Sequence, residues 1–279
     1  MPGVAIVAQG AMGAGLARRL TEHGVAVITC LDGRSPASAA RAAAAGMRAV
    51  AFGALAEAGT VLSVLPPSEA LAFAGRMAPL LRPGMLYADC NAISPALALR
   101  IGEVLAPSGC DYADAGIIGG PPRADGYTPR IYASGPHAAR LAALEAHGLR
   151  VPVLDGPVGA ASALKLCYAG ITKGLTALGS AMLLAAERDG AGEALRAELA
   201  ESQPALLTWL GRSVPGMFDK AYRWVGEMEE IAAFLGPERG EGEVYRGAAR
   251  LYARLAEDHA GAGEESAALR EALAAARQG

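Results

Sequence analysis

The feature that most constrains the fold is a change of pattern just past the middle of the chain. As far as residue 154, short apolar segments alternate with segments of helical periodicity, and after Gly159 only helical patterns occur. Alternating strands and helices are typical of a doubly wound α/β sheet with helices on both faces. We therefore predict an N-terminal Rossmann domain over residues 1–158 and an all-α domain over residues 159–279.

The predicted strands are mostly continuous apolar runs, as expected for a parallel sheet that is covered on both faces. They lie at residues 4–7, 25–31, 49–51, 60–65, 85–88, 111–118, 130–135 and 151–154. In the second domain we predict helices at residues 160–188, 201–211, 222–235 and 244–260, and a surface helix in the tail after residue 261.

The first predicted strand, residues 4–7, runs directly into a turn of small residues and then into a helical pattern. Glycine at position 10 allows phosphate groups to approach the backbone, and Gly13 allows the helix to pack closely on the strand. Ala8 stands at the first glycine position of the dinucleotide-binding pattern G-x-G-x-x-G, which requires its φ to be negative. An ordinary strand-to-helix turn is the alternative. The predicted cofactor contacts are Gln9, Gly10, Ala11, Met12 and Gly13.

The end of the next predicted strand carries both an acid and an arginine. In a dinucleotide-binding unit, an acid here binds the ribose 2′-hydroxyl of NAD, whereas an arginine binds the 2′-phosphate of NADP. Gly33 follows Asp32 and indicates that this acid shapes a turn. We therefore predict that Arg34 and Ser35 contact the cofactor and that NADP(H) is favoured over NAD(H). Alternatively, Ser35 and Pro36 only cap the following helix.

Three further segments end strands and supply candidate contacts. Leu65 and Pro66 close an apolar strand and are predicted to contact the cofactor, and Asn91 follows the next strand and is predicted to contact substrate. Gly119 and Gly120 follow the run 111–118, and adjacent glycine amides can form a concavity that binds a carboxylate. A hairpin turn fits these two glycines equally well.

Lysine is rare in this chain. Of 25 basic residues only Lys165, Lys173 and Lys220 are lysines. Unlike arginine, a buried lysine can lose its proton and act as an acid or base. Lys165 lies in an apolar sequence with no acid within four residues, and helical spacing puts Tyr168 and Thr172 near its face. We predict Lys165 as catalytic and these two residues as substrate contacts. Lys173, about 80° around the helix, is the second candidate, and a structural lysine that reaches solvent is the alternative.

The order of these parts resembles the β-hydroxyacid dehydrogenase superfamily, which includes 6-phosphogluconate dehydrogenase and 3-hydroxyisobutyrate dehydrogenase. The resemblance covers the whole chain. In the second domain, residues 163–174 and 224–231 are most similar to a bacterial branch with a phosphogluconate-dehydrogenase-like C-terminal domain. The matching pieces in the first domain and at its end are residues 10–13, 34–35, 65–66, 114–120 and 156–165.

The resemblance implies an active site in a cleft between the two domains, often completed by a second subunit. It also implies hydride exchange between a nicotinamide and a hydroxy or keto acid, with Lys165 as general acid/base and with burial lowering its pKa. Ile118 replaces a common serine and Ala169 a common asparagine, so Tyr168 or Thr172 would supply the missing polar group. Both departures argue against 6-phosphogluconate itself as substrate.

Two other functions remain open from the sequence. Imine reductases have similar folds, but they often carry aspartate or tyrosine at the position of Lys165. A non-catalytic NADP(H)-binding protein would need no acid/base residue at all.

The charge and composition of the chain restrict the kinds of partner that it can bind. A net charge of −3 and a pI near 5.9 provide no basic surface for nucleic acid or an anionic membrane. Residues 1–3 show no signal-peptide pattern, the uncharged stretch 174–186 is too short to span a bilayer, and a cytoplasmic location is predicted. The spacing of the four cysteines predicts no metal site. The apolar helix 164–186 predicts a homodimer that binds a small-molecule substrate.

Overall fold

The computed structural model describes residues 3–236 and 238–274. The chain divides into two compact units, residues 1–166 (unit 1) and residues 167–279 (unit 2). It passes from one to the other within a single long helix, α6 (Ala160–Arg188), which coincides with the predicted helix.

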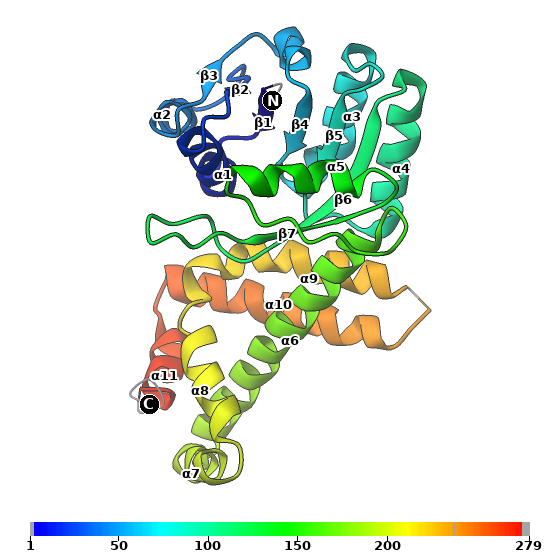
Figure 1. Cartoon of the computed structure of the whole chain (residues 1–279). Coiled ribbons are helices and arrows are strands. Elements are labelled where there is room, and N and C mark those ends of the chain that lie inside the picture. Colours follow the sequence, from blue (N-terminus) through cyan, green and yellow to red (C-terminus); the bar gives the residue numbers. More distant parts are fainter. Residues whose placement is uncertain (1–2, 237, 275–279) are drawn as a thin grey trace. The chain divides into compact units, whose positions relative to one another are not determined.

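Unit 1 is built on a seven-stranded sheet with the order β3-β2-β1-β4-β5-β6-β7 (Figure 1). The first six strands in this order pair in parallel, and β7 runs antiparallel to β6. The predicted doubly wound sheet is therefore confirmed. The strands are β1 (Val4–Val7), β2 (Val27–Thr29), β3 (Arg48–Ala49), β4 (Thr60–Ser63), β5 (Leu86–Asp89), β6 (Asp111–Ile118) and β7 (Arg130–Ser134).

Helices cover both faces of this sheet. Alternate residues of β1 enter two different cores: Val4 and Ile6 pack in one cluster with Leu16, while Val7 packs in the other with Phe73. Since both faces are buried, the strands need apolar residues at every position, which is why they read as continuous apolar runs. The helices are α1 (Ala11–Glu22), α2 (Pro36–Ala44), α3 (Ala70–Met77), α4 (Pro95–Leu105) and α5 (Ala138–Ala142).

The strand order reverses between β1 and β4. Val7, the last residue of β1, pairs in register with Ser63, the last residue of β4. In open parallel sheets, the crevice at the carboxyl ends of such a strand pair is the usual ligand site. The turns that follow β1 and β4 are thus the parts of unit 1 best placed to hold a cofactor.

The predicted strand at residues 151–154 is wrong. This segment forms only isolated bridges, in which Leu154 N–H donates to Ala133 O at 2.8 Å and Ala133 N–H donates to Pro152 O at 3.0 Å. Pro152 has no N–H to continue a ladder, so a regular strand cannot form there.

Unit 2 is entirely helical in its described residues. Besides the second part of α6 it contains α7 (Gly192–Ser202), which the sequence did not indicate, and four further elements that do correspond to predicted helices. Its core includes Met228 and Ile231 of α9 with Tyr252 and Leu255 of α10, all buried. The four other helices are α8 (Pro204–Ser213), α9 (Ala221–Leu235), α10 (Glu241–Ala260) and α11 (Glu264–Ala272).

Helix α6 is long and apolar enough, by length and composition alone, to cross a membrane. Its most apolar window has a mean hydropathy of 1.3 and is 33% buried. The uncharged stretch 174–186 is shorter than this apolar window, because the window can contain one or two charged residues. The prediction that the segment is too short to span a bilayer therefore underestimated its apolar length. One such helix is weak evidence for a span, since core helices of water-soluble proteins meet the same criterion.

Helix α1 packs closely on the end of β1 at Gly13. A Cβ added at Gly13 would lie 1.9 Å from the Ala8 carbonyl oxygen, whereas one added at Gly10 would meet nothing within 4 Å. Gly13 is therefore fixed by packing, and the space over Gly10 is open to a ligand.

These two glycines form a matched pair for a stability experiment. We expect Gly13→Ala to lower the free energy of unfolding by about 3 kcal/mol or more, because the backbone must move to relieve the overlap. Gly10→Ala should cost only about 1 kcal/mol, the price of a poorer N-cap residue. Urea denaturation followed by circular dichroism measures both, and equal effects would contradict this account of Gly13.

Candidate active site

The β1–α1 turn presents an uncapped helix N-terminus. Gly10 is the N-cap of α1, in extended conformation with φ −67° and ψ 179°, and no side chain caps the helix. Ala8 does not have a positive φ, so the alanine at the first motif position is accommodated. Free N–H groups at a helix N-terminus, next to an open glycine, can bind a phosphate.

The Gln9 side chain points into the protein and not toward that turn. It is 1% exposed, and its amide nitrogen donates to the Thr29 hydroxyl and, at 2.9 Å, to the Cys30 carbonyl oxygen. Gln9 thus ties the end of β1 to the end of β2. Only its backbone remains as a cofactor contact, and its carbonyl oxygen already accepts from Arg41 Nε at 2.9 Å.

Arg41 is a candidate that the sequence analysis missed. Besides holding the Gln9 carbonyl, its guanidinium donates to Ser38 Oγ at 3.0 Å, and Ser38 Oγ lies 3.2 Å from Ser35 Oγ. Two hydroxyl groups and an arginine therefore meet at the first turns of α2. The available signal was helical spacing, since positions 35, 38 and 41 repeat every three residues.

Arg34 and Ser35 occupy the turn after β2. Gly33 has a φ of 70° and Arg34 N–H donates to Leu31 O at 3.0 Å, which closes the turn beside the exposed Asp32. Ser35 Oγ accepts from Ser38 N–H at 3.3 Å and caps α2, as the alternative interpretation proposed. The Arg34 guanidinium lies 3.6 Å from the Glu69 carboxylate, which holds it at the protein surface.

Asn91 is engaged inside the protein. Both of its amide hydrogens are used, in bonds of 2.8 Å to Ser63 Oγ and 2.9 Å to Asp89 Oδ2, and the side chain is 2% exposed. Its oxygen accepts from Leu65 N–H at 2.5 Å. Asn91 therefore fixes the backbone that leads to the exposed Pro66. Its side-chain amide has no free hydrogen left to donate to a substrate, as the predicted contact would require.

The carboxyl group of Asp89, at the same sheet edge, has an unusual environment. Burial, together with the neighbouring charge of Asp114, raises the pKa of Asp89 to about 7, against hydrogen bonds from Asn91 that lower it. Asp89 and Asp114 are register partners at the ends of β5 and β6. Two adjacent buried carboxyl groups disfavour double ionisation.

Asp114 anchors the N-terminus of α6. It is fully buried, and Oδ2 accepts from the N–H groups of Gly159 and Ser162, each at 3.0 Å, while Oδ1 accepts from Ser162 Oγ at 2.6 Å. Ser134 Oγ donates to Asp114 Oδ2 and accepts from Ala161 N–H, both at 3.0 Å. A carboxylate at a helix N-terminus is stabilised by the free N–H groups and the helix dipole.

The same region fixes the position of Lys165. A Cβ added at Gly116 of β6 would lie 3.0 Å from Lys165 Cβ and 2.7 Å from the Ala161 carbonyl oxygen. The absence of a side chain at Gly116 thus lets the first turns of α6 lie directly on β6. Lys165 is half-buried there.

Gly119 and Gly120 begin the loop that joins β6 to β7. Ile118 pairs with Arg130 across the antiparallel ladder, so the hairpin interpretation describes the backbone. Gly119 has a φ of 122°, and a Cβ there would lie 2.2 Å from the Tyr127 hydroxyl. Further along this loop, Pro122 packs against α1, where a Cβ on Gly15 would be 2.8 Å from it. The loop therefore lies beside the helix of the proposed cofactor turn.

The remaining predicted substrate residues lie on α6 within unit 2. Tyr168 is 50% exposed, and the Thr172 hydroxyl donates to the Tyr168 carbonyl oxygen at 2.8 Å. The second lysine candidate, Lys173, is paired with Glu227, and its Nζ lies 5.0 Å from the ring centroid of Trp224. Burial lowers the pKa of Lys173, and the Glu227 charge opposes that shift.

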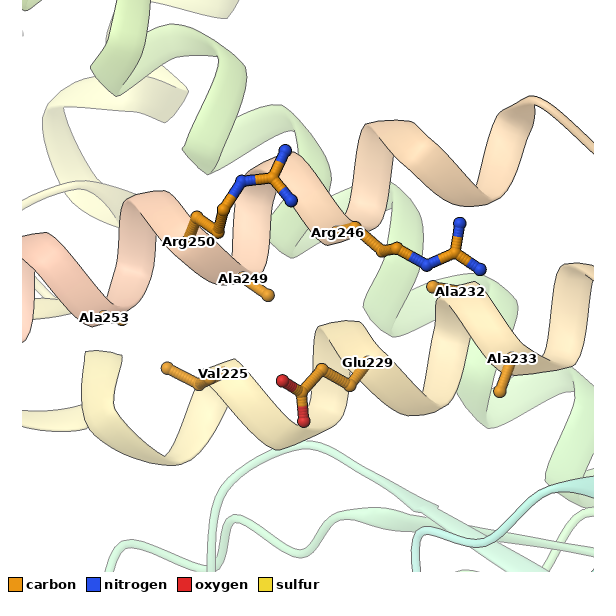
Figure 2. Close-up of a pocket in the computed structure, with 8 residues that line it drawn as sticks. All are labelled: Val225, Glu229, Ala232, Ala233, Arg246, Ala249, Arg250 and Ala253. Atoms are coloured by element: carbon orange, nitrogen blue, oxygen red, sulfur yellow. The ribbon is translucent and has the colours of Figure 1, made fainter. Parts of the chain in front are cut away.

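Unit 2 also has an open pocket between α9 and α10 (Figure 2). Its volume is about 450 Å³, and alanines and Val225 form most of its lining. In Figure 2 the Glu229 side chain lies along α9, and the Arg250 side chain points away from α9. Glu229, Arg246 and Arg250 all line it, but among the described residues no ion pair joins Glu229 to either arginine.

The described residues contain no group of three or more His, Cys, Asp or Glu side chains that could hold a metal ion. All four cysteines are free thiols, and Cys167 is exposed.

Two family models match parts of the chain. The family model for the NAD-binding domain of 6-phosphogluconate dehydrogenase matches residues 3–146, and a model for a domain of unknown function matches residues 186–255. No curated protein sequence matches the chain.

Several solved structures share the whole fold. A conserved protein of unknown function, reported to be structurally similar to 3-hydroxyacid dehydrogenases, is 27% identical with a TM-score of 0.77, over 95% of this chain and 98% of that one. Mycobacterium tuberculosis 3-hydroxyisobutyrate dehydrogenase with L-serine is 20% identical with a TM-score of 0.70, over 97% and 99%. An Aspergillus terreus reductive aminase with NADPH is 20% identical with a TM-score of 0.59, over 97% and 99%. The last two show the fold alone.

The Asp89 environment predicts an unusual pH dependence of stability. Its pKa of about 7 in the folded protein lies above the ordinary value of 3.8, so the folded state holds a proton that the unfolded chain releases. Stability should therefore fall as pH rises from about 4 to about 7, by roughly 1.4 kcal/mol per pH unit at most.

Urea denaturation at pH 5 and pH 8 tests this prediction. Asp89→Asn should reduce the loss of stability between the two pH values, whereas Asp32→Asn, at an exposed position, should not. A wild-type protein and an Asp89→Asn variant with the same pH dependence would contradict the assignment.

Proposed function

The chain belongs to the β-hydroxyacid dehydrogenase superfamily, in the family of the NAD-binding domain of 6-phosphogluconate dehydrogenase, and we propose that it is an NAD(P)-dependent oxidoreductase that interconverts a small hydroxy acid and the corresponding keto acid. The observation that carries this proposal is the anchoring of α6. Asp114 and Gly116 of β6 hold the start of α6 against this strand. Helix α6 carries Lys165, and β6 leads to Gly119 and Gly120.

The residues of the β1–α1 turn fit a dinucleotide. The open space over Gly10, the uncapped N-terminus of α1 and the close packing at Gly13 together would hold the pyrophosphate. Leu65 and Pro66, fixed through Asn91, would line the same sheet edge. A bound nicotinamide would supply the hydride acceptor or donor.

Lys165 would move the proton. In the oxidation of a hydroxy acid, the neutral amine would take the proton of the substrate hydroxyl, and in the reverse reaction the ammonium would give it to the carbonyl oxygen. In its charged form it would also stabilise negative charge that develops on that oxygen. The amides of Gly119 and Gly120 would bind the substrate carboxylate, with Tyr168 and Thr172 as further contacts.

Substitution of Lys165 tests the acid/base role. We expect Lys165→Met to lower kcat on an identified substrate by about 10³-fold, a typical contribution of a general acid/base. NADPH affinity should stay within about twofold of wild type, because the proposed cofactor contacts are elsewhere in unit 1. Cys167→Ala, an exposed neighbour on α6, is the control.

The substrate screen for this experiment uses hydroxy acids, keto acids and imines, with NADPH absorbance as the readout. Unchanged turnover in Lys165→Met would refute the acid/base role. Turnover of imines alone would favour the imine reductase alternative, which the reductive aminase fold also fits. NADPH binding by the wild-type protein with no turnover of any compound would favour a non-catalytic NADP(H)-binding protein.

We further propose that NADP(H) is preferred over NAD(H). Arg34, Ser35, Ser38 and Arg41 gather arginine and hydroxyl groups at the start of α2, where the adenosine ribose of a dinucleotide would lie. Glu69 forms an ion pair with Arg34, so the Arg34 guanidinium would have to interact with both the Glu69 carboxylate and the bound phosphate.

Affinities for NADPH and NADH check this preference. Arg34→Ala and Arg41→Ala should each weaken NADPH binding by about tenfold, the loss of one charge-assisted contact, and change NADH binding much less. Arg48→Ala, at an exposed position of β3, serves as the control. Equal wild-type affinity for the two cofactors would refute the role of Arg34 and Ser35.

A homodimer is also proposed, because α6 exposes a row of apolar side chains. Tyr168, Ile171, Leu178 and Met182 are 50%, 68%, 61% and 53% exposed and follow helical spacing along one side. We expect light scattering to show a dimer in the wild type and a monomer in the double variant Ile171→Asp and Leu178→Asp. Leu99→Asp in unit 1, at 51% exposure, should remain dimeric. A monomeric wild-type protein would contradict the proposal.

A further inference from the structure

A cavity within unit 2 gathers the rarest residue types of this chain. It has a volume of about 270 Å³ and lies between α6, α8 and the start of α9. Both tryptophans of the protein, Trp209 and Trp224, and two of its three lysines, Lys173 and Lys220, line this cavity. All of these residues belong to unit 2, so the cavity does not depend on the placement of the two units.

The charge of the cavity is positive. Lys173, Lys220 and Arg212 line it, and Lys173 is already paired with Glu227. Among the residues that the structure describes, neither Lys220 nor Arg212 takes part in an ion pair. Two cations at the cavity therefore remain for an anionic group of a ligand.

An unsatisfied hydroxyl group lies at the same place. Ser213, the last residue of α8, lines the cavity, and its buried Oγ has no hydrogen-bond partner among the residues that the structure describes. Leaving a buried polar atom unpaired costs about 1–3 kcal/mol, so such atoms in native proteins call for an explanation. A ligand oxygen in the cavity would supply the missing partner.

One of the two tryptophans, Trp224, is held in place by its neighbours. Trp224 packs edge-to-face on Tyr252 with ring centroids 5.2 Å apart, and the Tyr252 hydroxyl donates to the Lys173 carbonyl oxygen at 2.5 Å. A fixed indole ring offers a flat apolar surface without the entropy loss of ordering a flexible side chain.

From these observations we propose that the cavity binds a small organic carboxylate with a flat apolar body. Lys220 and Arg212 receive the carboxylate, Ser213 Oγ hydrogen-bonds to it, and the indole rings of Trp209 and Trp224 contact the apolar body. The size of the cavity suits a single-ring molecule. Thr172, which is also proposed as a substrate contact, lines this cavity. The inference nevertheless concerns binding to unit 2 and needs no turnover.

Tryptophan fluorescence of the full-length protein gives a direct readout, since both tryptophans line the cavity. Benzoate is the probe, benzamide tests the ring without the charge, and acetate tests the charge without the ring. We expect saturable quenching by benzoate, at least tenfold weaker binding of the other two, and weaker benzoate binding at high ionic strength. Quenching by benzamide at the same concentrations as benzoate, or quenching by benzoate that never saturates, would overturn the proposal.

Three variants locate the site. Lys220→Met and Arg212→Met, both at exposed positions, should each weaken benzoate binding about tenfold, whereas Arg188→Met, outside the cavity, should not. Ser213→Ala should not lower the free energy of unfolding, because the hydroxyl has no partner to lose and its removal relieves the cost of burying it, and yet it should weaken benzoate binding severalfold. Wild-type affinity in both charge variants would overturn the proposal. So would a Ser213→Ala variant that is less stable and binds benzoate as wild type does, because the hydroxyl would then be structural.

Discussion

The rest of unit 1 depends on how the buried carboxylate of Asp114 is satisfied. A charge that is removed from water must be compensated by hydrogen bonds, and the donors here are the first N–H groups of α6 and the hydroxyl groups of Ser134 and Ser162. One residue thereby joins β6, β7 and the start of α6. The position of Lys165 follows from that junction, because it lies on the first turns of the helix, against Gly116.

The same physical pattern recurs at the other strand ends. Gln9 links the ends of β1 and β2, and Asn91 links the ends of β4 and β5. In both cases a side chain that the sequence suggested as a ligand contact is turned inward to hold backbone. The site in unit 1 therefore presents backbone N–H groups and glycines at its surface, with the polar side chains as a second layer that keeps these groups in place.

Glycines in this unit serve contact between elements as much as ligand access. Gly13, Gly15 and Gly116 each lie where another backbone or a proline ring approaches too closely for a Cβ, while Gly10 and Gly120 face open space. The first group determines how α1, the β6–β7 loop and α6 pack on the sheet. The second group leaves room for a ligand. The sequence alone does not separate these two roles, because it does not show which glycines lie against another backbone or ring.

The sequence by itself determined the architecture of unit 1 and the length of α6, and it singled out Lys165 as the candidate acid/base, whose role stays a prediction. Apolar runs, glycine stops and the rarity of lysine are local signals, and they do not require knowledge of what packs against them. It failed at residues 151–154, where Pro152 cannot join a ladder, and at α7, whose residues are largely exposed and carry little apolar periodicity. Only the tertiary structure decided the contacts of Asp114 and Arg41 and the inward orientation of Gln9 and Asn91. Most hydrogen-bond partners of these side chains lie far away in the sequence. The pattern of residue types encodes neither such distant contacts nor the direction in which a side chain points.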